Sequence, residues 1–287
     1  MTTSTSTERP LLIIDGDNLA HRAYHSMPKS LKSPDGRPIN AIVGWTNMLV
    51  TLWEAEQPRS IYVAWDTLSV GTYRHELWPT YQGGRVFDNA IVKQLDLLPG
   101  LSAAFGFGVG KGAGYEADDF MAGAAIAETK RGGRSLLLTT DRDAYQLVSD
   151  SVMVLAPRKG VRDLMRIGPA QVVERMGVLP EQVPDFKAIA GDASDGIPGA
   201  KGIGPKGAAE LLLKYGTLDA ILDARTDTIP ASLADQLRMF KRVVSMQTEV
   251  EVELPETAPP NWANAAAELR RLGAENLSER IAARVHV

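Results

Sequence analysis

The sequence predicts an α/β fold in which a mainly parallel sheet is flanked by helices. Three runs rich in apolar residues, at 10–14, 60–65 and 135–140, are typical of strands that are buried on both faces. Stretches with helical spacing separate these runs, and this alternation is the pattern of a parallel sheet. The rest of the chain is helical in pattern, so we expect a core at 1–168 and a helical region at 169–287.

The elements of the first third follow from the order of strands, loops and helical spacing. The first strand ends at Asp15 and leads into a helical stretch, while the prolines and glycine of residues 29–40 predict a loop. Helical spacing returns at 39–56, and the second strand leads to Asp66. After an irregular segment we expect a helix at 87–98.

The remaining elements are mostly helices. Beyond the third strand, residues 152–155 predict a fourth strand. Further helices are expected at 120–127, 182–190, 207–215 and 263–283.

Three carboxylates crowd the start of the helix at 120–127, namely Glu116, Asp118 and Asp119. Gly114 can turn the chain there, and a helix N-terminus favours negative charge. This preference does not offset the repulsion among neighbouring carboxylates, which raises their pKa values unless a cation joins them. The cluster is therefore either a solvated acidic helix start or part of a metal site.

Each of the three apolar strands leads to an aspartate, and these are Asp15, Asp66 and Asp141. Ligands of open parallel sheets bind beyond the carboxyl ends of the strands, so we expect the three side chains to lie close together. An aspartate after a strand is also common as a helix cap or a turn residue. Three of them, together with Glu116, favour a metal site.

The composition excludes several classes of protein. Without cysteine the chain forms neither a disulfide nor a thiolate metal site, and no apolar run is long enough to span a membrane. Residues 1–7 are polar and lack the apolar centre of a signal peptide, so we expect a cytoplasmic protein without membrane contact. The net charge of −4 argues weakly against nucleic acid as a partner. However, nine of the 35 acidic residues are candidates for one site, which leaves fewer acids elsewhere than the 31 Lys and Arg.

A glycine-rich segment at 191–206 connects two predicted helices. Gly202 and Gly204 allow a tight hairpin, which Lys201 and Lys206 flank. Such a hairpin can hold a nucleic-acid backbone without reading the bases. The alternative is an ordinary connection between helices with solvated lysines.

Four motifs make the chain resemble the 5′-nuclease (flap endonuclease) superfamily. They are Leu-Ile-Ile-Asp-Gly, Gly-Tyr-Glu-Ala-Asp-Asp, Thr-Thr-Asp-Arg-Asp-Ala-Tyr-Gln-Leu and Gly-Asp-Ala-Ser-Asp-Gly-Ile-Pro-Gly-Ala-Lys-Gly-Ile-Gly-Pro-Lys. Over about residues 11–255 the chain looks most like the bacterial 5′–3′ exonucleases and the N-terminal nuclease domain of DNA polymerase I. The resemblance implies a PIN-like nuclease core, a helical arch at about 74–98 and a helix-three-turn-helix at about 185–215.

The resemblance also implies a metal-dependent 5′–3′ exonuclease or flap endonuclease that acts on DNA flaps, 5′ ends and nicked or gapped duplexes. Its metal-binding acids match Asp15, Asp66, Glu116, Asp118, Asp119, Asp141, Asp143, Asp192 and Asp195. We expect two or more Mg²⁺ or Mn²⁺ ions, because oxygen ligands select hard cations. We also expect a potassium ion held by hairpin carbonyls against the DNA backbone, and a monomer.

Carried over to the arch, the resemblance implies Arg74 and Arg85 as catalytic residues whose charge stabilises the phosphate. The residues expected to contact DNA are Arg22, Tyr81, Gln82, Lys201, Gly202, Gly204 and Lys206. At Gln82, relatives commonly have a lysine that is thought to touch the scissile phosphate, so either Arg74 or Arg85 compensates or the rate or the substrate preference is altered. Tyr81 either stacks on an unpaired base or packs in the arch. Asp17, at a usually uncharged position, is a candidate tenth acid.

The expected mechanism uses two ions about 4 Å apart, which clamp the attacking and leaving oxygens at phosphorus, with a metal-bound water as nucleophile. The tighter site would be formed by Asp15, Asp66, Glu116 and Asp118. The residues completing it and holding the second ion would be Asp119, Asp141, Asp143, Asp192 and Asp195.

Two other functions are open. A DNA-binding homologue with little or no activity is suggested by Gln82. A phosphatase of the haloacid-dehalogenase type is suggested by Asp15-Gly16-Asp17 after an apolar strand, although that class does not need the glycine hairpin.

Overall fold

The computed structural model describes residues 9–67, 70–82, 89–225 and 228–286. Within these residues it contains a six-stranded sheet of order β3-β2-β1-β4-β5-β6. The strands are β1 (Leu11–Asp15), β2 (Ser60–Ala64), β3 (Gly108–Gly110), β4 (Ser135–Leu138), β5 (Val152–Gly160) and β6 (Asp163–Ile167). The first five strands are parallel and β6 is antiparallel to β5, which confirms the prediction of a mainly parallel sheet flanked by helices.

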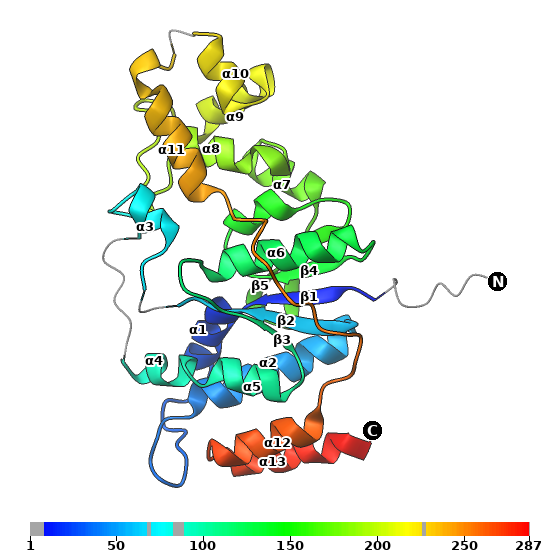
Figure 1. Ribbon diagram of the computed structural model, residues 1–287. Helices are drawn as coiled ribbons and strands as arrows, with labels where there is room; N and C mark the ends of the chain where they lie inside the picture. The colour runs from blue at the N-terminus through cyan, green and yellow to red at the C-terminus, as the bar shows by residue number, and fades with distance from the viewer. Residues whose placement is uncertain (1–8, 68–69, 83–88, 226–227, 287) are drawn as a thin grey trace, which may run out of the picture.

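Helices cover both faces of this sheet (Figure 1). One face carries α6 (Ala117–Lys130), and the other carries α1 (Gly16–Ser26), α2 (Asn40–Glu56), α4 (Asn89–Leu95) and α5 (Leu98–Ala104). No helix among the described residues is both long and apolar enough to cross a membrane.

The two faces hold two separate cores because side chains alternate along a strand. In β1, Leu11 and Ile13 join the core on the α6 side, whereas Leu12 and Ile14 join the core on the α2 side. All four side chains are fully buried. A strand that is apolar at every position is therefore required here, which explains the continuous apolar runs in the sequence.

A helical region extends beyond α6, on the side of the sheet that α6 covers (Figure 1). It contains α7 (Pro169–Met176), α8 (Val183–Ala190), α9 (Pro205–Tyr215), α10 (Leu218–Asp223) and α11 (Ala234–Val244). Short 3₁₀ helices lie at Asp143–Leu147, Pro180–Gln182, Ala231–Leu233 and Ala283–His286. Of the predicted arch, the structure describes α3 (Tyr73–Leu77) and α4, while residues 83–88 lie outside the described part.

After α11 the chain returns to the sheet. It crosses α6 so closely that a Cβ atom at Gly123 would lie 2.7 Å from the carbonyl oxygen of Val250. It then forms α12 (Trp262–Arg271) and α13 (Glu275–Ala282), which pack beside α5 and join the core that contains Leu12 (Figure 1). The boundary at residue 168 stays a prediction, but the residues after 169 do not form one unit in space.

Several predicted elements need correction. The strands β3 and β6 were not expected, because three residues of Gly-Val-Gly carry no apolar run and β6 is a partly polar edge strand. The helix expected at 263–283 is two helices separated near Gly273, whose φ of +82° suits glycine. The helix expected at 87–98 is present as α4, while residues 87 and 88 lie outside the described part and α5, which begins at Leu98, was not expected.

Candidate active site

Six acidic side chains line one cavity of about 460 Å³ at the carboxyl ends of the parallel strands. We call them the pocket acids: Asp15, Asp17, Asp66, Glu116, Asp118 and Asp141. Asp15 is the last residue of β1, and Asp66 and Asp141 follow shortly after β2 and β4. Because these strands are parallel neighbours, the sheet brings together three aspartates that are far apart in the sequence.

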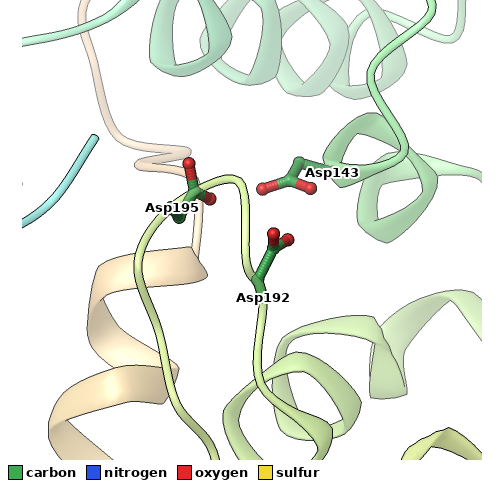
Figure 2. A group of neighbouring side chains, drawn as sticks. All are labelled: Asp143, Asp192 and Asp195. Carbon is green, nitrogen blue, oxygen red and sulfur yellow. The ribbon is translucent and has the colours of Figure 1, made fainter. Parts of the chain in front are cut away.

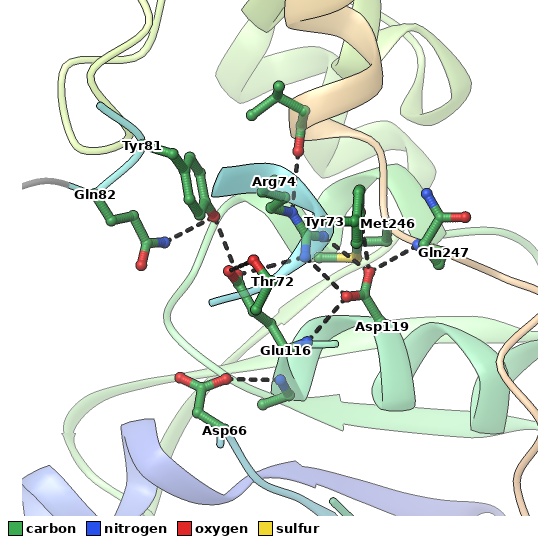
Figure 3. A network of polar contacts seen from close by, with 12 residues as sticks. Asp66, Thr72, Tyr73, Arg74, Tyr81, Gln82, Glu116, Asp119, Met246 and Gln247 are labelled. Atoms are coloured by element: carbon green, nitrogen blue, oxygen red, sulfur yellow. Dashed lines mark hydrogen bonds and ion pairs between the residues drawn. The ribbon is translucent and has the colours of Figure 1, made fainter. Parts of the chain in front are cut away.

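Short hydrogen bonds fix the pocket acids in place. The amide of Asn18 (3.0 Å) and the hydroxyl of Thr139 (2.7 Å) donate to the carboxylate of Asp15. The amide of Ala117, in the first turn of α6, donates to Asp66 Oδ1 at 2.7 Å (Figure 3). Asp17 accepts from the amide of Asp66 at 2.8 Å. The carboxylates of Asp15, Asp17 and Asp66 are thus oriented by the protein itself.

The pocket acids carry more negative charge than the surrounding protein neutralises. Burial, with repulsion from Asp66 and Asp141, raises the pKa of Asp15 to about 7. Burial and then repulsion from Asp66 raise the pKa of Asp17 to about 8. The pKa values of Asp118 and Glu116 are also raised, in both cases chiefly by burial. Crowded carboxylates of this kind favour the charged form only when a cation joins them.

Three further aspartates form a second acidic group beside the pocket acids (Figure 2). One oxygen from each of Asp143, Asp192 and Asp195 lies within 4.8 Å of the others. The side chain of Lys187, from α8, forms ion pairs with Asp143 and, at 2.6 Å, with Asp192. We call these three aspartates and the lysine the Lys187 group.

The Lys187 group differs electrostatically from the pocket acids because it contains its own cation. Although burial acts to raise the pKa of Asp192, the hydrogen bond and charge of Lys187 prevail and lower it. Asp195, which Lys187 does not contact, has its pKa raised by burial and by repulsion from Asp192. The two groups meet at Asp141, whose Oδ1 accepts the amide hydrogen of Asp143 at 2.9 Å.

Asp119 and Arg74 are not among the residues that line the cavity, although Arg74 Nη1 lies 3.5 Å from Oε2 of the pocket acid Glu116. The guanidinium of Arg74 donates two hydrogen bonds of 2.8 Å to Asp119 and one of 3.0 Å to the carbonyl oxygen of Val243 (Figure 3). Asp119 is fully buried and also accepts from the amide of Gln247 at 2.8 Å. Asp118 and Asp119 are successive residues of a helix, so their side chains point in directions about 100° apart. Only Asp118 reaches the cavity.

The arch residues Tyr81 and Gln82 are also held by the protein. Tyr81 is 4% exposed and donates to Glu116 Oε2 at 3.0 Å, so packing describes it better than a stacking surface. Gln82 lines the cavity and donates to Tyr81 and Asp195. Arg22 lines the cavity as well, whereas the predicted catalytic residue Arg85 lies outside the described residues.

The glycine hairpin before α9 is open to solvent. Gly202 has a φ of +86°, and a Cβ atom at Gly202 or Gly204 would meet nothing within 4 Å. Lys201 is exposed, and Lys206 is 92% exposed and lies 4.0 Å from Glu210. A ligand backbone can therefore approach the hairpin closely.

Sequence reasoning missed Lys187, because a lysine in a helix ordinarily belongs to a solvated face. Its spacing of five residues before Asp192 gave no signal, since the chain turns at Gly191, with a φ of +83°, before reaching that aspartate. Thr139, which orients Asp15 and Asp141, was missed because it lies inside a predicted strand.

The donor set of both groups fits divalent cations. It consists of carboxylate oxygens, which hard cations such as Mg²⁺ and Mn²⁺ prefer. A divalent ion bound among these carboxylates would offset the burial and the repulsion that raise the pKa values of Asp15 and Asp118.

Residues 10–177 match the family domain described as "5'-3' exonuclease, N-terminal resolvase-like domain", and residues 178–264 match "5'-3' exonuclease, C-terminal SAM fold". DNA polymerase I of Mycobacterium tuberculosis is 40% identical over 230 residues, which cover 79% of this chain and 25% of that protein. The chain thus spans about a quarter of the length of this relative.

Solved structures share the fold. The T5 5′-exonuclease with bound divalent zinc ions has a TM-score of 0.69 at 21% identity and covers 95% of this chain and 97% of its own. The bacteriophage T5 D15 flap endonuclease in a complex with DNA and metal ions has a TM-score of 0.69 at 22% identity, with 95% and 98% covered. With two matching domains that together extend from residue 10 to residue 264, the chain belongs to the 5′–3′ exonuclease family.

Proposed function

We propose that this chain is a divalent-metal-dependent 5′ nuclease that hydrolyses phosphodiester bonds in DNA flaps and at 5′ ends. The observation that carries the proposal is the presence of two acidic groups side by side, one of which lines a cavity at the carboxyl ends of the parallel strands. Membership of the 5′–3′ exonuclease family supports the same conclusion.

The two groups divide the work of holding cations. Four of the pocket acids would hold one ion, namely Asp15, Asp66, Glu116 and Asp118. The three aspartates of the Lys187 group, with Asp141, would hold a second. Divalent ions bound there would lower the pKa of the attacking water and stabilise charge on the phosphate oxygens. The hydrogen bonds to Asp15 and Asp66 keep these carboxylates oriented, so little reorganisation is needed when the phosphate arrives.

DNA would be held at two places. Arg22 lines the cavity, where its charge can pair with a phosphate oxygen. The exposed hairpin with Gly202, Gly204, Lys201 and Lys206 would hold the duplex backbone, with a potassium ion on its carbonyls. The hairpin follows the segment that carries Asp192 and Asp195, so the position of the duplex would set the position of cleavage. The T5 D15 flap endonuclease, which shares the fold, is in a complex with DNA and metal ions, and this supports DNA as the partner.

The phosphatase alternative is disfavoured by the match of residues 10–264 to the two 5′–3′ exonuclease domains. We retain the non-catalytic DNA-binding homologue as an outcome of the test.

The test is product mapping on a labelled 5′-flap duplex with Mg²⁺, with Mn²⁺ and with EDTA. We expect cleavage near the junction of flap and duplex only with a divalent ion, and loss of cleavage but retained duplex binding for Asp141→Asn and Asp143→Asn. The control is Asp150→Asn, because Asp150 is exposed and outside both groups. Flap binding without cleavage under any metal would establish the non-catalytic homologue instead.

A further inference from the structure

Gln82 has an unusual backbone conformation next to both acidic groups. Its φ is +48°, in the left-handed region that side chains other than glycine rarely adopt. Such conformations persist where surrounding contacts hold them, and they cluster at functional sites. Gln57, with a φ of +44°, has the same conformation at the C-terminus of α2, outside the cavity.

The side-chain amide of Gln82 uses both of its N–H groups. Nε2 donates to the hydroxyl of Tyr81 at 2.8 Å and to Asp195 Oδ1 at 3.2 Å. The hydroxyl of Tyr81 in turn donates to Glu116 Oε2 at 3.0 Å. A continuous chain of hydrogen bonds therefore runs from Asp195 to Glu116, part of which Figure 3 shows.

This chain joins the two acidic groups. Glu116 is a pocket acid at the N-terminus of α6, and Asp195 belongs to the Lys187 group beyond α8. Gln82 and Tyr81 form the connection, and neither belongs to an acidic group. Because the amide is neutral, it donates to both sides without reducing the negative charge that would hold cations.

The backbone around Gln82 is also held independently of its side chain. The indole of Trp78 donates to the carbonyl oxygen of Gly196 at 3.1 Å, and its ring packs edge-on against Phe240. In a Gln82 variant, the segment that follows α3 should therefore stay packed against the segment that carries Asp195 and Gly196.

We propose that Gln82 is a positioning residue that fixes the relative placement of Glu116 and Asp195, and with it the spacing of two bound divalent ions. This inference rests on the proposed function, because it concerns the same site. It differs from a direct contact between Gln82 and DNA in that the amide acts through the carboxylates.

The test compares Gln82→Met with wild type and with Gln57→Met. Methionine keeps the length of the side chain but has no N–H donor, and Gln57→Met is matched in residue type and backbone conformation. Binding of Mn²⁺ is measured by calorimetry without DNA, and the distance between bound Mn²⁺ ions by the spin coupling in electron paramagnetic resonance. Single-turnover cleavage and KM for flap DNA complete the comparison.

We expect Gln82→Met to weaken the weaker Mn²⁺ binding step and to lower the cleavage rate, each by about tenfold, as for the loss of a hydrogen bond to a charged group. The spin coupling should change, while KM stays within about twofold and Gln57→Met behaves as wild type. Tyr81→Phe should have a similar effect, and the double variant should be less than additive because both act in one chain of hydrogen bonds.

Unchanged Mn²⁺ affinity and spin coupling in Gln82→Met would overturn the inference, as would an effect confined to KM. Because Mn²⁺ binding is measured without DNA, these outcomes remain decisive if wild type binds Mn²⁺ but cleaves no DNA. Mn²⁺ binding without DNA cleavage in wild type would count against the proposed function. The role of Gln82 would then be decided by the Mn²⁺ affinity and the spin coupling alone.

Discussion

The pocket acids and the Lys187 group are neighbouring carboxylate clusters that solve the same electrostatic problem differently. The pocket acids crowd one cavity, and burial together with mutual repulsion raises the pKa values of Asp15, Asp17 and Asp118. The Lys187 group holds an ammonium between two of its aspartates, and the pKa of Asp192 falls. A divalent ion can therefore bind among the pocket acids directly, whereas an ion that binds the aspartates of the Lys187 group must displace the Lys187 ammonium.

The largest expected effect separates two adjacent acids. Asp118→Asn should lower flap cleavage by at least about 10³-fold, since it removes a charge aimed into the cavity. It should leave the melting temperature in EDTA unchanged or higher, because it relieves repulsion. Asp119→Asn is the matched control, and should lower the free energy of unfolding by about 3 kcal/mol by leaving Arg74 without its buried partner. Equal stability of the two variants in denaturant titrations would contradict this assignment.

The next effect concerns the internal cation. Lys187→Met should lower the free energy of unfolding in EDTA by about 3 kcal/mol, because Asp143 and Asp192 lose their buried partner. Mn²⁺ should restore more stability in this variant than in wild type, since the ion no longer competes with an ammonium. Thermal unfolding of both proteins with and without Mn²⁺ provides the measurement. If Mn²⁺ stabilises the variant and wild type equally, the Lys187 ammonium does not occupy the place of the ion.

A smaller effect is the pH dependence of the metal-free protein. Asp15 and Asp17 have folded-state pKa values of about 7 and about 8, above the ordinary value of 3.8. The folded state therefore binds more protons than the unfolded state, so the free energy of unfolding should fall as pH rises from about 4 to about 8. The slope is at most about 1.4 kcal/mol per pH unit for each proton.

Asp17→Asn should flatten this pH profile, and saturating Mn²⁺ should flatten it further. Denaturation curves in EDTA at several pH values provide the measurement. A stability that rises over the same interval would have the wrong sign for buried, uncompensated acids.

The smallest effect is expected at the glycine hairpin, which belongs to neither acidic group. Lys206→Ala should weaken duplex binding severalfold and reduce the salt dependence of binding by about one ion, without changing metal affinity. Lys130→Ala, at the end of α6, is the control. A change in cleavage rate at saturating DNA would mean that Lys206 acts at the cleavage site itself.

The sequence predicts the convergence of Asp15, Asp66 and Asp141 because two simple rules suffice. Apolar runs identify buried parallel strands, and parallel strands place their carboxyl ends at one edge. The acid-rich start of α6 was recognisable as well, because three like charges in one helical turn repel one another unless a cation lies among them.

Such rules do not predict the different roles of individual residues within the site. Asp118 and Asp119 are indistinguishable in sequence, and only the packing of α3 and Val243 against α6 places Arg74 beside the second of them. Lys187 likewise acquires its partners through the turn at Gly191, which local spacing does not reveal.

The central claim is that both acidic groups hold divalent ions in one site. Its most direct test is anomalous scattering from crystals soaked in Mn²⁺. Two peaks are predicted, one among Asp15, Asp66 and Asp118 and one beside Asp143, Asp192 and Asp195, with the Lys187 ammonium displaced. An electron-density map without an anomalous peak among the pocket acids would contradict the account.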